Sequence, residues 1–432
     1  MKFHKLRATV AAASLVSMGA CVFAADAPAE TNMISQIGAN AQKVTDALGI
    51  EFSGYMRSGF YGASDNAPKG GYSLGGSLQF FRLGNEGNNY MELKLGKRFD
   101  LGGGVKWGTY YMPYVFNGSN GTQQIYTDIS GLDFAPNVSF WAGQRFHRIS
   151  DVHMIDNWLM QDGGDYGAGA DGIAVGSAKL NVAIHTDGNT GNGNTSTNNA
   201  RRVNFQLRDI DTNPGGKLNL TGAMISGNFA KGSAGGALGL LHNQSNFIIP
   251  GVNNQLFIQS STGHAGMDGR FYNLDAAATA PSLVQSALGV VSTVAGTAAM
   301  PKPGAKQTRI ADSINWQLGV FGGQAIMGYE TLTPDASATT KNFSLGGRMS
   351  YGVAKNVKLL AELAATNSKT DGMATKTLNK GTLAVALSPN TDFWTRPELR
   401  LYATRVNWNN AAGIISGRNN ATTFGAQVEA WW

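Results

Sequence analysis

The feature that most constrains the fold is an alternation of polarity that runs from residue 50 to the end of the chain. This region divides into about eighteen segments of roughly 8 to 13 residues, most of them bounded by Gly, Asn, Asp, Ser or Pro. Examples are RRVNFQLRDI (201–210) and VKLLAELAATN (357–367). A period of two residues predicts strands with unlike faces. The chain is therefore expected to be all-β.

Strand length and composition favour a membrane barrel over a soluble sandwich. Sandwich strands average about 5 or 6 residues, whereas an even number of strands of about 9 to 11 residues is typical of transmembrane barrels. Charged residues make up only 14% of the chain and hydrophobic ones 42%. Because lipid offers backbone N–H and C=O groups no hydrogen-bond partner, the sheet must close on itself. We predict an 18-stranded antiparallel transmembrane β-barrel over residues 50–432, with a water-filled lumen.

The first two dozen residues form a separate segment. Lys2, Lys5 and Arg7 precede an apolar run, and small residues precede Ala25, which predicts a signal peptide over residues 1–24. Without those three bases the chain has 31 Lys and Arg and 28 Asp and Glu, so the net charge falls from +6 to +3. Scattered charges of this kind argue against nucleic acid as a partner. Cys21 leaves a lipoprotein cleavage site as an alternative and lies within the signal, so no mature disulfide is expected.

Two further segments have no fixed interpretation. In the periplasmic segment 25–49, Ile34, Ile37, Ala41, Val44 and Leu48 recur with 3-4 spacing, which fits a short coiled coil over residues 33–49 if three barrels meet, or else a frayed tail. The apolar tract 282–300 is too short and too rich in Ala, Ser and Thr to span a membrane, and we interpret it as a long loop.

Several motifs occur in the order of a known family. They are SGYMRSG (53–59), RLGNE (82–86), YMELKLG (90–96), WAGQRF (141–146), SDVHMID (150–156), NPGG (213–216), FWTRPELRLYAT (393–404) and FGAQVEAWW (424–432). On these motifs the chain resembles the maltoporins, sugar-specific porins of the bacterial outer membrane. The resemblance implies a homotrimer of 18-stranded barrels, a third loop folded inward, and facilitated diffusion of sugars along a slide of aromatic residues.

The resemblance also implies a set of functional residues. The aromatic slide would comprise Tyr55, Tyr90, Trp394 and Trp431. The polar track and constriction would comprise Arg57, Arg82, Glu92, Arg148, Asp151, Asp156 and Trp158. The partners would be oligosaccharides and outer-membrane lipid, and no cofactor is expected.

Strand parity tests this assignment independently. In the first strand Ile50, Phe52, Met56 and Phe60 share one face, which places Tyr55 on the polar, lumenal face. The same counting places Tyr90 and Glu92 inside. It places Trp394, Arg396, Glu398, Arg400 and Tyr402 inside if one strand runs through Pro397, and it separates inward Trp431 from outward Trp432.

A pyranose has apolar faces, which can lie on aromatic rings, and hydroxyl edges, which can form hydrogen bonds with charged side chains. For Lys94, Arg396 and Arg400 we keep the simpler interpretation of pore lining.

The chain also departs from the family pattern. Ile149 stands where a track arginine is expected, the loop near residues 116–125 lacks the tryptophan that would reach a neighbouring pore, and no mid-channel aromatic can be placed near Leu256 and Phe257. These departures put a maltodextrin preference in doubt. A sucrose-type pore or a general small-solute porin remain as alternatives.

Other classes of function have weaker support. Residues 71–75 (GYSLG) match G-x-S-x-G, but that motif needs a strand-to-helix elbow and strand-like sequence follows it. His153 with Asp151 and Asp156 lacks the pattern of a metal site. An adhesin or structural anchor would need no inward aromatics. We therefore expect a passive porin and not an enzyme.

Overall fold

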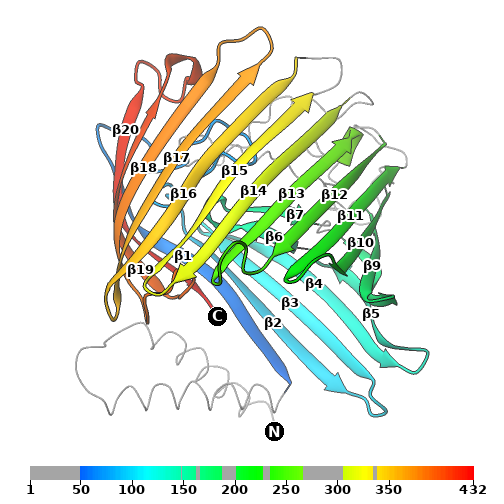
Figure 1. Ribbon diagram of the computed structural model, residues 1–432. Coiled ribbons are helices and arrows are strands. Elements are labelled where there is room, and N and C mark those ends of the chain that lie inside the picture. Colours follow the sequence, from blue (N-terminus) through cyan, green and yellow to red (C-terminus); the bar gives the residue numbers. More distant parts are fainter. Residues whose placement is uncertain are drawn as a thin grey trace, which may run out of the picture.

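The computed structural model describes residues 49–146, 148–161, 166–186, 201–226, 234–265, 305–333 and 338–432. Figure 1 shows long tilted strands arranged around a common axis. The predicted signal peptide, nearly all of segment 25–49 and the tract 282–300 lie outside the described residues. In the part of the chain that the structure describes, no helix is long and apolar enough to cross a membrane.

The strands fall into two sheets. The larger sheet contains β1 Ile50–Ala63, β2 Tyr90–Asp100, β3 Lys106–Phe116, β4 Ser119–Leu132, β5 Ala135–Gln144, β8 Tyr166–Val175, β9 Ala178–Thr186, β10 Arg201–Asp211, β11 Gly216–Ser226, β12 Gly235–Gln244, β13 Val252–Thr262, β14 Lys306–Leu318, β15 Phe321–Thr333, β16 Thr340–Ala354, β17 Val357–Thr370, β18 Lys376–Leu387, β19 Glu398–Trp408 and β20 Asn420–Trp431. The smaller sheet contains β6 Arg148–Val152 and β7 Asn157–Gln161. Short 3-10 turns cover η1 His153–Ile155, η2 Gly263–Ala265 and η3 Asn410–Ala412.

The larger sheet is a closed antiparallel barrel. Its 18 strands pair with their neighbours in the chain, β5 pairing with β8. The last strand returns to the first, with Trp431 opposite Tyr55 and Thr423 opposite Ala63. Closure removes the free edges that a membrane cannot tolerate. The predicted strand number and topology are confirmed.

Burial in the barrel is reversed relative to a soluble protein. Along β17, Lys358 and Glu362 are fully buried, whereas Leu363 on the other face is 62% exposed. Leu401 of β19 and Leu383 of β18 are likewise exposed. An apolar outer surface around a polar interior is the arrangement of a transmembrane barrel.

The two ends of the barrel differ in the length of their connections. The turn end carries short connections such as residues 211–216, where the Gly216 amide donates to the Asn213 carbonyl at 2.7 Å. The opposite, loop end carries residues 64–89 and the connection between β5 and β8, of which residues 145, 146 and 148–161 are described. Between β3 and β4, however, it has only a two-residue turn of Asn117 and Gly118, both with positive φ, as tight hairpins prefer. The loop expected over residues 116–125 is therefore a two-residue turn, and the other residues of that range belong to β3 and β4.

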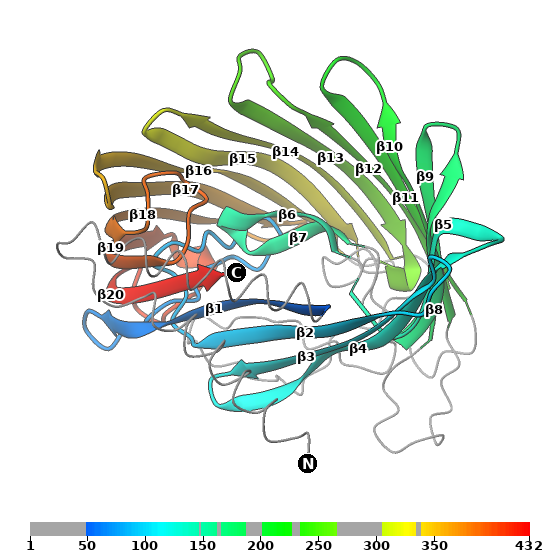
Figure 2. The same cartoon turned by 90° about the horizontal axis from the view of Figure 1, so that it is seen from below.

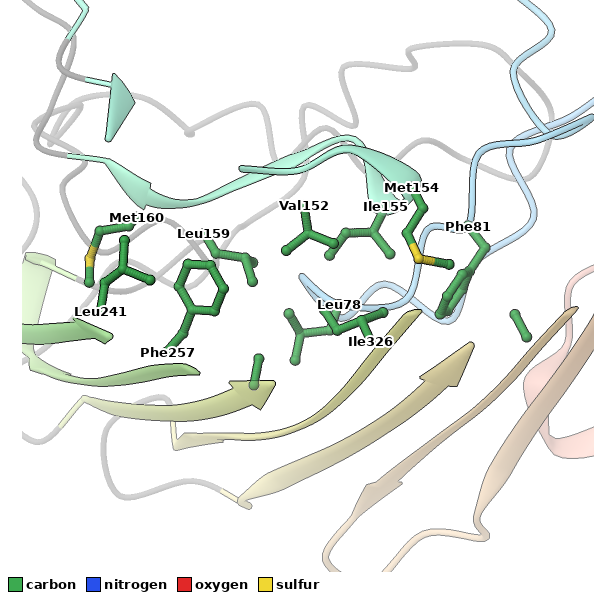
Figure 3. Close-up of a cluster of buried hydrophobic side chains, with 12 residues drawn as sticks. Leu78, Phe81, Val152, Met154, Ile155, Leu159, Met160, Leu241, Phe257 and Ile326 are labelled. Atoms are coloured by element: carbon green, nitrogen blue, oxygen red, sulfur yellow. The ribbon is translucent and has the colours of Figure 1, made fainter. Parts of the chain in front are cut away.

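The β6–β7 hairpin lies inside the barrel, as Figure 2 shows. Leu159 and Met160 from the hairpin pack against Leu241 and Phe257 of the barrel wall (Figure 3). The Met154 amide donates to Gln324 of β15 at 3.1 Å. The apolar face of the hairpin thus fixes it to β12–β15, and its other face is directed across the lumen. This is the inward third loop that the resemblance implies.

A second loop, residues 64–89, also folds into the barrel, which the sequence did not predict. The Leu83 amide donates to Glu362 of β17 at 3.0 Å, and Lys380 of β18 donates to the Leu83 carbonyl at 2.7 Å. Next to it, Gly84 has a φ of +64°, and a Cβ there would lie 2.1 Å from Thr404 Oγ1. Only glycine permits so close an approach to the wall.

Candidate functional site

A row of aromatic rings follows one diagonal of the barrel wall. Trp431 of β20 is opposite Tyr55 of β1, Tyr55 is opposite Glu92 of β2, and Glu92 is opposite Tyr114 of β3. Tyr90 lies 6.1 Å from Tyr55 and 6.3 Å from Tyr114 between ring centroids. Because a hydrogen-bonded row crosses tilted strands obliquely, these rings climb from the turn end towards the loop end. We call Trp431, Tyr55, Tyr90 and Tyr114 the aromatic row.

Trp394 joins the row from a different element than expected. β19 begins at Glu398, so Trp394 and Arg396 lie in the connection between β18 and β19 and not on a strand. The expectation of one strand through Pro397 is wrong. The connection is held by Lys358, which donates to the Asp392 carbonyl at 2.8 Å, and Trp394 reaches the His153 ring at 5.6 Å.

The two terminal tryptophans occupy opposite faces, as the alternation predicts. Trp431 contacts interior groups: its ring lies 4.2 Å from the Arg396 guanidinium and 5.4 Å from His153. Trp432 instead packs against Phe52 at 5.8 Å and is 39% exposed. One tryptophan therefore serves the lumen and the other the outer surface.

Arg82 is the centre of a buried charge network beside the row. Its guanidinium contacts the Tyr55 hydroxyl and lies 2.8 Å from Glu86 and 3.0 Å from Glu429. The Tyr55 hydroxyl in turn donates to Glu429 at 3.0 Å. Pairing on this scale compensates for burying so many charges. The network locks the orientation of the Tyr55 ring.

Arg57 extends the network along β1. Its Nε donates to Asn88 at 2.8 Å, and its guanidinium lies 3.4 Å from Glu86. It also lies 5.3 Å from the Tyr90 ring centroid. Arg57 therefore links the loop of residues 64–89 with the upper part of the row.

A second polar group surrounds Glu92. The Tyr90 hydroxyl donates to Glu92 Oε2 at 2.6 Å, and Arg148 of the hairpin pairs with Oε1 at 3.3 Å. The Arg148 guanidinium also lies 5.2 Å from the Trp158 ring and 4.1 Å from Phe146. The Arg148–Glu92 ion pair thus joins the hairpin to the barrel wall across the lumen. Trp158 is linked to the site by this contact with Arg148.

The two hairpin carboxylates have opposite electrostatic environments. Burial raises the pKa of Asp151, only partly offset by Arg82. Burial also disfavours the charge on Asp156, but Arg82 and Arg57 outweigh it and hold the pKa of Asp156 below its ordinary value. The distances agree, since Asp156 lies 3.5 Å from Arg57 and 3.6 Å from Arg82. Asp156 is therefore the more firmly ionised carboxylate.

His153 is a site residue whose role the sequence did not reveal. It lies between the Trp394 and Trp431 rings, with Nδ1 3.1 Å from Arg82. Burial lowers its pKa to about 3, so the ring is neutral at pH 7. No group of three or more His, Cys, Asp or Glu among the described residues is arranged to hold a metal. The ring instead fills the gap between the two tryptophans.

Other residues have roles that differ from simple pore lining. Arg396 lies 2.8 Å from Glu429, and the fully buried Arg400 contacts both Glu398 and Glu429. Lys94 lies apart from this network, 3.7 Å from Glu51. The sequence predicted only part of this network of arginines and glutamates. The strand alternation places Glu429 on the same face as Trp431, and so in the lumen. For Glu86 the sequence offered only its i, i+4 spacing from Arg82.

The mid-channel aromatic is absent from the lumen near residue 257. Phe257 points inward but is fully buried beneath the hairpin. The GYSLG segment (71–75) lies in the inward loop without a following helix, so it lacks the elbow that a nucleophilic serine needs. Ile149 packs at the edge of the apolar cluster under the hairpin.

Comparison with known proteins decides the family. The model of the LamB porin family matches residues 50–432, the whole barrel. The chain belongs to the LamB porin family. It is 27% identical over 409 residues to the maltoporin of Hahella chejuensis (strain KCTC 2396), covering 90% of this chain and 94% of that protein.

Solved structures resemble the chain more distantly. OccK3 (OpdO) of Pseudomonas aeruginosa is 8% identical with a TM-score of 0.47, covering 89% of this chain and 95% of that one. OpdQ of the same organism has a TM-score of 0.46 and 8% identity, covering 89% of this chain and 98% of that one. Membership of the LamB porin family makes the protein a channel of the bacterial outer membrane and not an enzyme.

Proposed function

We propose that this LamB-family porin is sugar-selective and that maltose, maltodextrins or related oligosaccharides diffuse passively along the aromatic row and Trp394. The observation that carries the proposal is the register of the rings, which lie on successive strands with fixed charges beside them. Each ring can hold the apolar face of a pyranose while neighbouring charges bond its hydroxyls. Several modest sites in series allow a solute to enter without being trapped.

The charge network supports this role by fixing the rings and offering polar edges. Tyr55 is held by Glu429 and Arg82, and Tyr90 by Glu92. We assign the polar track to Arg57, Arg82, Glu92, Arg148, Asp151 and Asp156, and we place Trp158 at the constriction. We also propose a homotrimer, in agreement with the resemblance to maltoporins.

The short turn at Asn117 and Gly118 modifies the family scheme. Since only two residues connect β3 and β4, we propose that the upper end of the slide comes from the same chain. Tyr114 and Phe116 each lie 6.3 Å from Tyr90 between ring centroids and occupy that position. We propose that each barrel of the trimer carries its own complete slide.

Ion current through the purified protein in a planar bilayer, titrated with maltose, maltotriose and sucrose, tests the proposal. We expect maltotriose to reduce the current in a saturable manner and Trp394→Ala to weaken that block. If no sugar reduces the current, the protein is a general porin. If sucrose blocks as well as maltotriose does, the sucrose-type alternative replaces the maltodextrin one.

A further inference from the structure

A cavity of about 390 Å³ lies on the opposite side of the lumen from the aromatic row. It is bounded by the first residues of the hairpin, including Arg148 and Ser150, and by the inner face of β9–β13. Its volume falls within the range of about 300 to 1,000 Å³ that is usual for small-molecule sites. None of the residues assigned to the slide lines it, and of the polar track only Arg148 does.

Amide side chains dominate this cavity. Five successive strands each contribute one, all directed inward: Asn181, Gln206, Asn219, Asn243 and Gln255. An amide both donates and accepts hydrogen bonds, as does a hydroxyl group. A surface of this kind therefore matches the edges of a polyhydroxylated molecule.

Hydrogen bonds fix several of these amides in place. Asn181 donates to the Gln206 carbonyl oxygen at 2.9 Å. Gln255 donates to Asn243 Oδ1 at 3.1 Å and to Ser150 of the hairpin at 2.9 Å. These bonds use the carbonyl oxygens of Gln206 and Asn243. Their NH2 groups donate to no other described residue and can therefore donate to a ligand. Such prior ordering lowers the entropy lost on binding.

A β-bulge adds a charge pair to the same wall. The register of β10 shifts between Leu207 and Ile210, and Asp209 has a φ of +65°. The bulge brings consecutive residues Arg208 and Asp209 to the cavity, where they pair at 3.1 Å. Asn219 Oδ1 accepts a hydrogen bond of 3.1 Å from the Asp209 backbone amide, which stabilises the bulge. Bulges often redirect side chains in this way beside functional sites.

The cavity is polar but electrically balanced. Arg208 is paired with Asp209, and Arg148 is paired with Glu92 at 3.3 Å. With both arginines compensated, an acidic sugar would gain no unpaired cation. The lining also includes no aromatic ring, and its apolar contacts come from Ile149 and Leu241. A ligand here would be held by hydrogen bonds and not by stacking.

We propose that this amide cavity is a second solute site, which binds neutral polyhydroxylated molecules by hydrogen bonds alone and accepts open-chain polyols as well as sugar rings. It differs from the aromatic row in this respect, because a straight-chain polyol presents no pyranose face to stack. The proposal rests on the proposed function only in taking the lumen as the path of the solute. Arg148, which contacts Glu92 and lines the cavity, joins the two sites.

Sorbitol and maltotriose distinguish the two sites in a planar bilayer. For the unaltered protein we expect a saturable reduction of current by sorbitol beyond the reduction caused by solution viscosity. Asn243→Leu keeps the approximate size of the side chain and removes its polar groups, and it should weaken sorbitol binding about fivefold, as loss of a hydrogen bond would. Asn243→Gln should stay within about twofold of the unaltered protein.

The slide variant provides the matched comparison. Trp394→Ala should weaken maltotriose block and leave the sorbitol constant within about twofold. Conductance without sugar shows whether each variant forms a normal pore, and Asn181→Leu, on the far side of the cavity, replaces Asn243→Leu if that variant does not.

The outcomes separate the two proposals. The proposal of an amide cavity is overturned if sorbitol reduces the current only through the viscosity of the solution. It is also overturned if Asn243→Leu binds sorbitol as the unaltered protein does. If maltotriose does not block the unaltered protein, or blocks Trp394→Ala as well as it blocks the unaltered protein, while sorbitol binding is saturable, the slide is overturned instead.

Discussion

The lumen has two unlike walls that solve the problem of a polar interior differently. On the wall with the aromatic row, ion pairs are sealed: the side chains of Arg82 and Glu429 are 2% and 0% exposed. On the wall with the amide cavity, the Arg208–Asp209 pair is 35% and 43% exposed. A buried charge that loses its partner is costly, so the ion pairs stay formed and hold the neighbouring rings in place. Neutral amides do not need an oppositely charged partner. We infer that the first wall is built for rigidity and the second for adaptable hydrogen bonding.

The largest expected contrast between the walls is in stability. Arg82→Leu removes one of the cations that compensate the buried Glu86 and Glu429, and we expect the free energy of unfolding from lipid vesicles to fall by about 3 kcal/mol. Arg208→Leu removes a half-exposed pair, whose contribution after solvent screening is below about 1 kcal/mol. Equal losses in the two variants would contradict the distinction between the walls.

Loosening the hairpin should affect both walls at once. Phe257→Ala leaves a cavity beneath Leu159 and Met160, and we expect about 3 kcal/mol of destabilisation with a larger, noisier conductance. Ile258→Ala, the next residue on the outer face, is the control. Unchanged conductance in Phe257→Ala would show that the hairpin does not depend on this contact.

Sugar binding should depend on the rings of the first wall. Trp394→Ala should lower the maltotriose association constant about fivefold, corresponding to about 1 kcal/mol of ring contact. Phe60→Ala removes an aromatic ring from the outer face of β1, where it is 67% exposed, and should leave the constant unchanged. Current titrations in a planar bilayer measure both, and equal effects would remove the case for a lumenal slide.

The smallest expected effect concerns pH. Burial raises the pKa of Asp151, whereas arginines hold the pKa of Asp156 low, so acidification from about pH 7 to about pH 4 neutralises Asp151 first. The lumen loses one negative charge, and the permeability ratio of cations to anions should fall by about twofold or less. Reversal potentials in a salt gradient report this ratio. Asp151→Asn should show the lower ratio at both pH values, and an unaltered pH dependence in that variant would assign the effect to another group.

Much of the barrel could be predicted because strand parity is a local property. In β1, the alternation alone placed Tyr55 inside and Phe60 outside, and the structure agrees. The same counting separated Trp431 from Trp432. It failed for Trp394, because a connection between strands has no fixed period from which orientation can be counted.

The sequence by itself determined the all-β class, the number of strands and the face on which each strand residue lies, since the pleated backbone turns successive side chains to opposite sides. Only the tertiary structure decided which charges meet, how the hairpin and the loop of residues 64–89 enter the lumen, and where the amides converge. The Tyr55–Glu429 hydrogen bond joins residues 374 positions apart. Contacts of that range depend on how the barrel closes and how its loops fold back, and no local pattern records them.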